Sequence, residues 1–320
     1  MNLVYARDVR PFIASEKRRK WADKLFYFHS TNRVLLRHEG GQACYFNYTQ
    51  DKWIKLDGVT GIMKREIWKR AAARSATHSA MRRSAARNAS RIAPRSAPRH
   101  APRSAPRNAR HPLQRMPGFM QGSLVHRQIA AVLEQHAQPT PQLCATLHPY
   151  AKAAIQAVLA RGWCPVACEY PVYDPELNMT TRIDMVAVRS DGVLVFIELK
   201  TGYSDGRFTH DTGNTWRGSA LKAIATQFPC NERNRAVVQV VLGAAMAIKM
   251  LDLPQKKVAA AVIRVDMAYA PTVIDVASTF LADLAVILHA LIIKRAVRAR
   301  TAAARSGIKR KRSASPGKRR

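Results

Sequence analysis

The chain is poor in acidic residues: its 320 residues include 53 Lys and Arg but only 21 Asp and Glu, for a formal net charge of +32. Acidic residues are missing altogether from residues 70–117 and from residues 294–320, each of which carries a net charge of +12. Residues 118–293 are nearly neutral, at +1, and are numerous enough to bury a core. We therefore expect a neutral folded domain between cationic arms, whose commonest partner is nucleic acid.

Long apolar runs and regular cysteine spacing are also missing. No apolar run reaches the roughly 18–20 residues that span a bilayer, since the best candidate, Leu281 to Ile293, contains Asp283 and His289. The first twenty residues lack the apolar region of a secretory signal. The 5 cysteines are odd in number and follow no repeating spacing, which argues against a disulfide framework. We expect a reducing intracellular compartment and no membrane partner.

Composition divides the chain into four parts. Residues 1–69 predict a small aromatic-rich β segment, residues 70–117 a linker, residues 118–293 an α/β domain and residues 294–320 a basic tail. The WW-like strand pattern at Ala43–Trp53 (ACYFNYTQDKW), partly repeated at Trp21–Leu35, leaves two interpretations open. These are a WW-like hairpin and a plain β-rich segment, and residues 21–53 are a candidate site for a protein partner.

The linker contains a short repeat, Ala-Pro-Arg preceded by Ile, Ser or His, in which proline recurs at every fourth position. Proline at this spacing prevents helix propagation, and the segment has too little apolar surface to offset its ordering entropy. We therefore expect a disordered linker that either binds phosphates or acts as a charged spacer. The candidate DNA-binding arginines of the repeat are Arg95, Arg99, Arg103 and Arg107.

Hydrophobic periodicity predicts the order of elements in the neutral domain. The expected helices are Ser123–Ala137, Pro149–Arg161, Arg233–Leu251 and Ser278–Arg298; the expected strands are Val166–Tyr173, Thr180–Val188, Val193–Leu199, Val258–Ala268 and Val273–Val276, with a loop over Gly202–Gly218. This order favours an α/β sandwich in which helices flank a central mixed sheet.

Three charged residues interrupt the apolar strands of this domain. Asp184 lies within one strand, and Glu198 and Lys200 lie at the end of the next, on the same face by the two-residue strand period. A buried carboxylate is costly unless it is paired or metal-bound. A hairpin turn at Ser190-Asp191-Gly192 would bring Asp184 to the same place. Two convergent carboxylates favour Mg²⁺, with Mn²⁺ as an alternative, and a nearby lysine can orient water or stabilise charge on a phosphate.

The pattern Asp184–x13–Glu198-Leu-Lys200, followed by Thr201-Gly202, resembles the core of the PD-(D/E)XK nucleases, in particular the RecB-like and phage-exonuclease-like branch. Gly122-Ser-Leu-Val-His126 is similar to that branch's GxxxH motif, and Glu169-Tyr-Pro-Val to its strand with an additional acid. Gln239 matches the first position of a QxxxY motif, but Gly243 stands where the motif has tyrosine. The likeness covers about residues 118–270.

The resemblance implies a PD-(D/E)XK, restriction-endonuclease-like fold and a Mg²⁺-dependent DNA nuclease, of the exonuclease type in repair, recombination or viral DNA processing. Asp184, Glu198 and Lys200 would be catalytic, and Glu169 and His126 would be further metal ligands. Gln239 and Arg182 would contact the DNA strand, although RNA is not excluded as a substrate.

Structural alternatives stay open for several of these residues. Asp184 could be the ion-pair partner of Arg182, His126 an ordinary polar position on a helix, and Glu169 a residue that caps an exposed strand. Two other functions use the same fold: a catalytically inactive nucleic-acid-binding protein, and a protein-interaction adaptor.

The tail is the second cationic segment. The cluster Lys309, Arg310, Lys311 and Arg312 is typical of a nuclear import signal, or of a second phosphate-binding arm. We expect the nucleus, or the host nucleus for a viral protein, as the location, with the cytoplasm as second choice.

Overall fold

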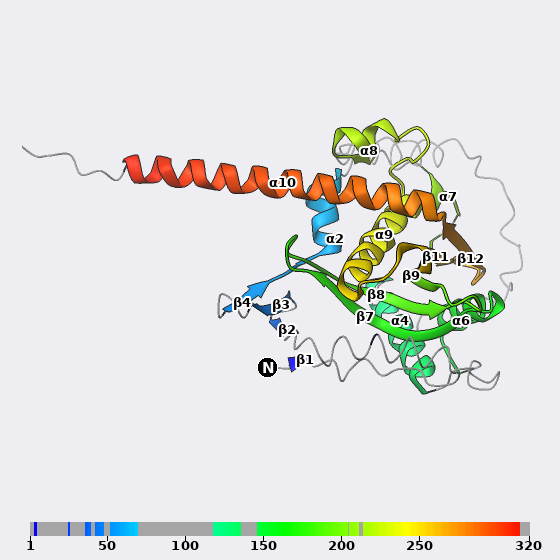
Figure 1. Cartoon of the computed structure of the whole chain (residues 1–320). Helices are drawn as coiled ribbons and strands as arrows, with labels where there is room; N and C mark the ends of the chain where they lie inside the picture. Colours follow the sequence, from blue (N-terminus) through cyan, green and yellow to red (C-terminus); the bar gives the residue numbers. More distant parts are fainter. Residues whose placement is uncertain are drawn as a thin grey trace, which may run out of the picture.

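The computed structural model describes residues 3–4, 25, 36–39, 42–47, 52–69, 118–135, 146–203, 205–210 and 214–313 (Figure 1). Its strands are β1 (Leu3–Val4), β2 (Leu36–Glu39), β3 (Gln42–Asn47), β4 (Lys52–Lys55), β5 (Asp57–Gly58), β6 (Trp68–Lys69), β7 (Cys164–Asp174), β8 (Met179–Val188), β9 (Leu194–Thr201), β10 (Thr215–Trp216), β11 (Val258–Val265) and β12 (Pro271–Val276). Its helices are α2 (Val59–Ile62), the π-helix η2 (Met63–Ile67), α4 (Gly118–Gln135), α6 (Pro149–Ala160), α7 (Asp205–Thr209), α8 (Ser219–Ala223), α9 (Glu232–Leu251), the 3₁₀ helix η4 (Gln255–Lys257) and α10 (Ser278–Ser313).

A mixed sheet forms the centre of the fold. Its strands follow the order β12-β11-β9-β8-β5, and β7 pairs with β8. The β9–β11 and β5–β8 pairs are parallel, whereas β7–β8, β8–β9 and β11–β12 are antiparallel. The predicted hairpin between β8 and β9 is present, and Gly192 in its turn has a φ of +81°, which glycine adopts without steric cost. The expectation of an α/β fold with helices around a mixed sheet is confirmed.

Helices cover both faces of this sheet (Figure 1). On one face, Val125 and Ile129 of α4 and Ile155 of α6 pack against alternate strand residues such as Ile197. On the other face, α9 and the first turns of α10 cover a second cluster that includes Phe196. Because both faces are buried, the strands are almost continuously apolar, and a charged residue within them needs a specific partner.

Helix α9 is the core helix of the second face. It is long and apolar enough to cross a membrane by length and composition, but 67% of its most apolar window is buried inside the protein. Gly243 allows α9 to pack closely on β8, because a Cβ at this position would lie 3.3 Å from Ile183 Cγ1. The QxxxY motif has a tyrosine at this position.

Several predicted boundaries were wrong for local reasons. The strand that begins at Val258 ends at Val265 and not at Ala268, because Asp266 accepts hydrogen bonds from the amides of Ala268 and Ala270 and so forms a turn. The segment Gly202–Gly218, expected to be a loop, contains α7 and β10. The latter pairs with β6 and buries Trp216.

The C-terminal helix differs most from the sequence prediction. We expected it to end at Arg298 and to be followed by a basic tail, whereas α10 continues to Ser313. Residues 299–313 are rich in alanine, arginine and lysine, which have high helix propensity, and the next proline is Pro316. The cluster Lys309–Arg312 therefore lies in the last turns of a helix that projects beyond the body of the domain (Figure 1).

The N-terminal segment has two parts. Strands β1 to β4 form an antiparallel sheet, in which Phe46 pairs with Trp53 across the β3–β4 hairpin; most of Trp21–Leu35 lies outside the described residues. Residues 57–69 instead pack on the central domain. Strand β5 pairs with β8, and the Arg235 guanidinium lies 3.9 Å above the Trp68 ring. The sequence analysis did not predict this attachment.

Candidate metal centre at a fork in the sheet

The central sheet divides between β8 and β9. These strands pair from Met185–Ile197 to Val188–Leu194, and then separate. Beyond that point β8 remains paired with β7, and β9 remains paired with β11. Asp184 and Glu198 are the first residues past the point of separation on their two strands, so the fork is lined by the charged residues that interrupt the apolar pattern.

Asp184 bridges the fork. Its Oδ2 atom accepts a hydrogen bond from the backbone amide of Leu199 at 2.7 Å. In a continuous sheet a backbone carbonyl of the neighbouring strand would take this role, and an unpaired buried amide is costly. Because only 13% of the Asp184 side chain is exposed, this bond also gives the buried carboxylate one of the donors that it needs.

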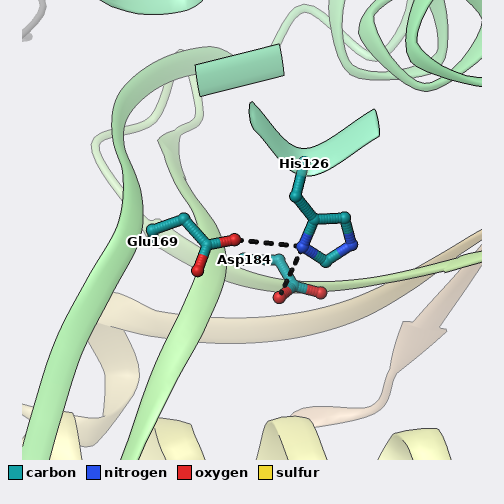
Figure 2. Close-up of side chains that lie close together, drawn as sticks. All are labelled: His126, Glu169 and Asp184. Atoms are coloured by element: carbon teal, nitrogen blue, oxygen red, sulfur yellow. Dashed lines mark hydrogen bonds and ion pairs between the residues drawn. The ribbon is translucent and has the colours of Figure 1, made fainter. Parts of the chain in front are cut away.

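His126 and Glu169 complete a cluster around Asp184 (Figure 2). The His126 Nδ1 atom, from α4, lies 3.0 Å from Glu169 Oε1 and 3.4 Å from Asp184 Oδ1. One ligand atom from each of the three residues lies within 4.8 Å of the others. The close-up shows the three side chains pointing toward one another from a helix and two strands.

A backbone irregularity accompanies Glu169. Its φ is +48°, in the left-handed region that residues other than glycine seldom occupy. The flanking residues Cys168 and Tyr170 pack on opposite faces of the sheet, although residues two apart in a regular strand share a face. Strand β7 is therefore irregular at Glu169, although its pairing register with β8 is the same on both sides of this residue, and backbone strain of this kind clusters at active sites.

Glu198 and Lys200 form a second group on the α9 face. The Lys200 ammonium donates to Glu198 Oε1 at 2.5 Å and to the Gln239 amide oxygen, on α9, at 3.2 Å. Only 5% of the Glu198 side chain is exposed, compared with 24% of Lys200. The lysine therefore has a fixed position and retains an exposed part.

Burial and mutual charge change the acidity of the cluster. Burial lowers the pKa of His126, but the hydrogen bond to Glu169 and the charges of Asp184, Glu169 and Glu198 outweigh it and raise this pKa to about 9. Burial and the charge of Asp184 raise the pKa of Glu198 to about 7. Burial likewise raises the pKa of Asp184. Without a metal ion, the cluster thus holds protons that a cation would displace.

The donors fit a divalent cation. Asp184 and Glu169 offer carboxylate oxygens, and His126 offers a nitrogen once it is deprotonated. Oxygen-rich sets of this kind suit Mg²⁺ and Mn²⁺, and the imidazole favours the softer Mn²⁺. Glu198 lies outside the 4.8 Å group but interacts electrostatically with Asp184, so it is a further carboxylate at the same fork.

The structure brings together His126, Glu169, Asp184, Glu198 and Lys200, all of which the sequence analysis selected. Asp184 forms an ion pair with His126, and Arg182, expected to contact the DNA strand, is exposed. Gln239, expected to contact DNA, accepts a hydrogen bond from Lys200. The linker arginines lie outside the described residues. Sequence reasoning missed the Leu199 amide, because a backbone donor has no sequence signature.

No protein-family model matches this chain, and no curated protein matches it either.

Proposed function

We propose that the protein is a divalent-metal-dependent DNA nuclease of the PD-(D/E)XK type, which hydrolyses phosphodiester bonds at the fork between β8 and β9. The observation that supports this function is the meeting of five chemically suited residues there. His126, Glu169, Asp184, Glu198 and Lys200 come from four elements and converge where the sheet opens. A structural ion pair needs only one acid and one base. This cluster has three carboxylates, a histidine and a lysine whose ammonium group is fixed by hydrogen bonds.

Each residue has a role in the proposed reaction. Asp184, Glu169 and His126 would hold the cation, with Glu198 next to them. A bound Mg²⁺ supplies Lewis-acid stabilisation of phosphoryl oxygens and lowers the pKa of water. Lys200, fixed by Glu198 and Gln239, donates a hydrogen bond to the attacking water or to a phosphate oxygen on which charge develops. The linker arginines would add affinity without reading sequence.

A cleavage assay tests this proposal. Purified protein is incubated with linear duplex, circular duplex and single-stranded DNA, with Mg²⁺, with Mn²⁺ and with a chelator. We expect metal-dependent cleavage that Glu198→Gln abolishes, and preference for linear over circular DNA if the enzyme is an exonuclease. DNA binding without cleavage under any of these conditions would overturn the proposal and favour an inactive nucleic-acid-binding protein.

A further inference from the structure

Helix α10 extends well beyond the part of it that packs on the domain. Helix α10 packs on the domain through Leu281, Leu284, Leu288 and Ile292, which are buried. Beyond Ile292 it continues to Ser313 and projects away from the body (Figure 1). We refer to residues 294–313 as the α10 arm. At 1.5 Å per residue the arm is about 30 Å long.

The charge of the arm is of one sign. Residues 294–313 include nine Lys and Arg and no acidic residue. Like charges on one helix repel and cost helical stability, and the arm has no acidic residue of its own to offset this repulsion. A polyanionic partner would remove the repulsion and stabilise the helix.

The helical period arranges the basic positions. At roughly 100° per residue, positions 294, 298, 305, 309 and 312 fall within a sector of about 60°. Lys294 and Arg298, the members of this set whose side chains the structure describes, are both exposed. The arm therefore has a row of basic positions along one face, about 27 Å from first to last.

Duplex DNA matches this row better than a membrane surface does. A duplex carries one negative charge per roughly 1.7 Å of axis, and its major groove, about 12 Å wide, admits an α-helix. Membrane-surface helices combine basic residues with large apolar ones such as Trp, Phe and Leu. The arm contains none of these three, and its apolar residues are mostly alanine.

We propose that the α10 arm is a helical DNA-binding element that lies along duplex DNA through this row of cations. The proposal rests on the proposed function only for the identity of the partner, and it extends that function with a binding surface separate from the fork. A fixed helix would hold the duplex at a set distance from the domain, which a flexible tail of equal charge would not do.

The experiment measures binding of the full chain in the Glu198→Gln background, so that cleavage does not enter. Anisotropy titrations with a labelled duplex are made over a series of salt concentrations, and circular dichroism is recorded with and without DNA. Ala303→Pro breaks the arm at its middle without a change in charge. Ala314→Pro, just beyond the end of the helix, is the matched control.

A second variant keeps the helix and the charge but disrupts the row. It combines Arg298→Ala and Ala299→Arg with Arg305→Ala and Ala303→Arg, which moves two charges about 100° or more around the helix. We expect this variant and Ala303→Pro to bind duplex at least ~10-fold more weakly, with a salt slope lower by about 1.8 for two lost phosphate contacts. Ala314→Pro should bind like the parent, and DNA should raise the temperature at which the helical circular dichroism signal is lost only when the arm is intact.

Two results would overturn the inference. Equal affinity of Ala303→Pro and the parent would show that charge alone, without a helix, binds DNA. Stronger binding to phosphatidylserine-rich vesicles than to duplex would identify the arm as a membrane element. The duplex-binding and vesicle-binding measurements do not depend on catalysis. If the protein binds DNA through the arm but never cleaves it, this inference holds and the nuclease proposal fails.

Discussion

The carboxylate of Asp184 accepts a hydrogen bond from the backbone amide of Leu199 across the fork, with an Oδ2–N distance of 2.7 Å. Its other oxygen faces His126 Nδ1 at 3.4 Å. One side chain therefore has two functions, since it closes the hydrogen-bonding gap where β8 and β9 separate and contributes an oxygen to the candidate metal centre. Substitutions that preserve an acceptor can separate these functions.

Asp184→Asn should abolish cleavage and preserve the fold. The amide oxygen still accepts the Leu199 hydrogen bond, but the negative charge that attracts Mg²⁺ is lost, so we expect a decrease in rate of at least ~10²–10³-fold. Asp184→Ala should lose activity and also unfold more easily, by about 1–2 kcal/mol, because the buried amide is left without an acceptor. Thermal melts run beside the cleavage assay separate the two effects.

Asp275→Asn is the matched control for the two Asp184 variants. Asp275 is also a strand carboxylate, but it forms an exposed ion pair with Arg161 and lies far along the chain from the residues of the fork. It should leave activity unchanged. If Asp184→Asn instead retained activity and lowered the melting temperature, Asp184 would be a structural residue only.

Lys200→Ala should eliminate cleavage without preventing metal binding, because the lysine acts on water and phosphate charge. Gln239→Leu removes the amide oxygen that accepts a hydrogen bond from Lys200 Nζ at 3.2 Å but keeps the lysine itself. It should reduce the cleavage rate less, by about tenfold. Lys249→Ala, which removes the two ion pairs of a half-exposed lysine with Asp174 and Glu176, is the control. Metal affinity is measured by titration with Mn²⁺; a Gln239→Leu rate as low as that of Lys200→Ala would mean that Gln239 itself touches the substrate.

The stability of the metal-free protein should fall as the pH rises. The folded-state pKa of His126, about 9, exceeds its unfolded value of 6.5, so its contribution is full below pH 6.5 and is lost as the pH rises through 9. The raised pKa of Glu198 has the same sign between 4.5 and about 7. Because Mg²⁺ competes with these protons, its stabilisation should be larger at pH 9 than at pH 6.5.

Melting temperatures with a chelator and with Mg²⁺, at several pH values, check this prediction. Asp184→Asn should lose most of the Mg²⁺-dependent increase at every pH. A Mg²⁺ effect equally large in parent and variant would place the ion elsewhere.

Charge in the linker should determine part of the salt dependence of DNA binding. Changing Arg95, Arg99, Arg103 and Arg107 to Gln removes up to four phosphate contacts, so the slope of log affinity against log salt should decrease by up to ~3.6. Deletion of residues 74–115 should decrease it further, and cleavage at low salt should survive both changes. An unchanged slope in the Gln variant, whose length is that of the parent, would identify the linker as a spacer.

Much of the candidate site was accessible from the sequence because of local rules. The two-residue strand period places Glu198 and Lys200 on one face, and apolar strands make Asp184 conspicuous. His126 and Glu169 were selected by resemblance of their motifs and not by any geometric argument. Gln239 was selected in the same way, and its contact with Lys200 depends on how α9 crosses the sheet, which helical periodicity does not specify.

By itself the sequence located β7, β8, β9, β11 and β12 of the central sheet, though not all of their ends, since buried strands need continuous apolar runs, and it showed which charged residues interrupt them. It also determined the two cationic segments, residues 70–117 and 294–320. Tertiary structure alone decided that β8 and β9 separate beyond the Met185–Ile197 pair, that Asp184 accepts a hydrogen bond from the Leu199 amide, and that residues 57–69 pack on the domain. These features depend on strand pairing and helix packing between segments distant along the chain, where the free energy of a contact is shared by residues that no local pattern connects.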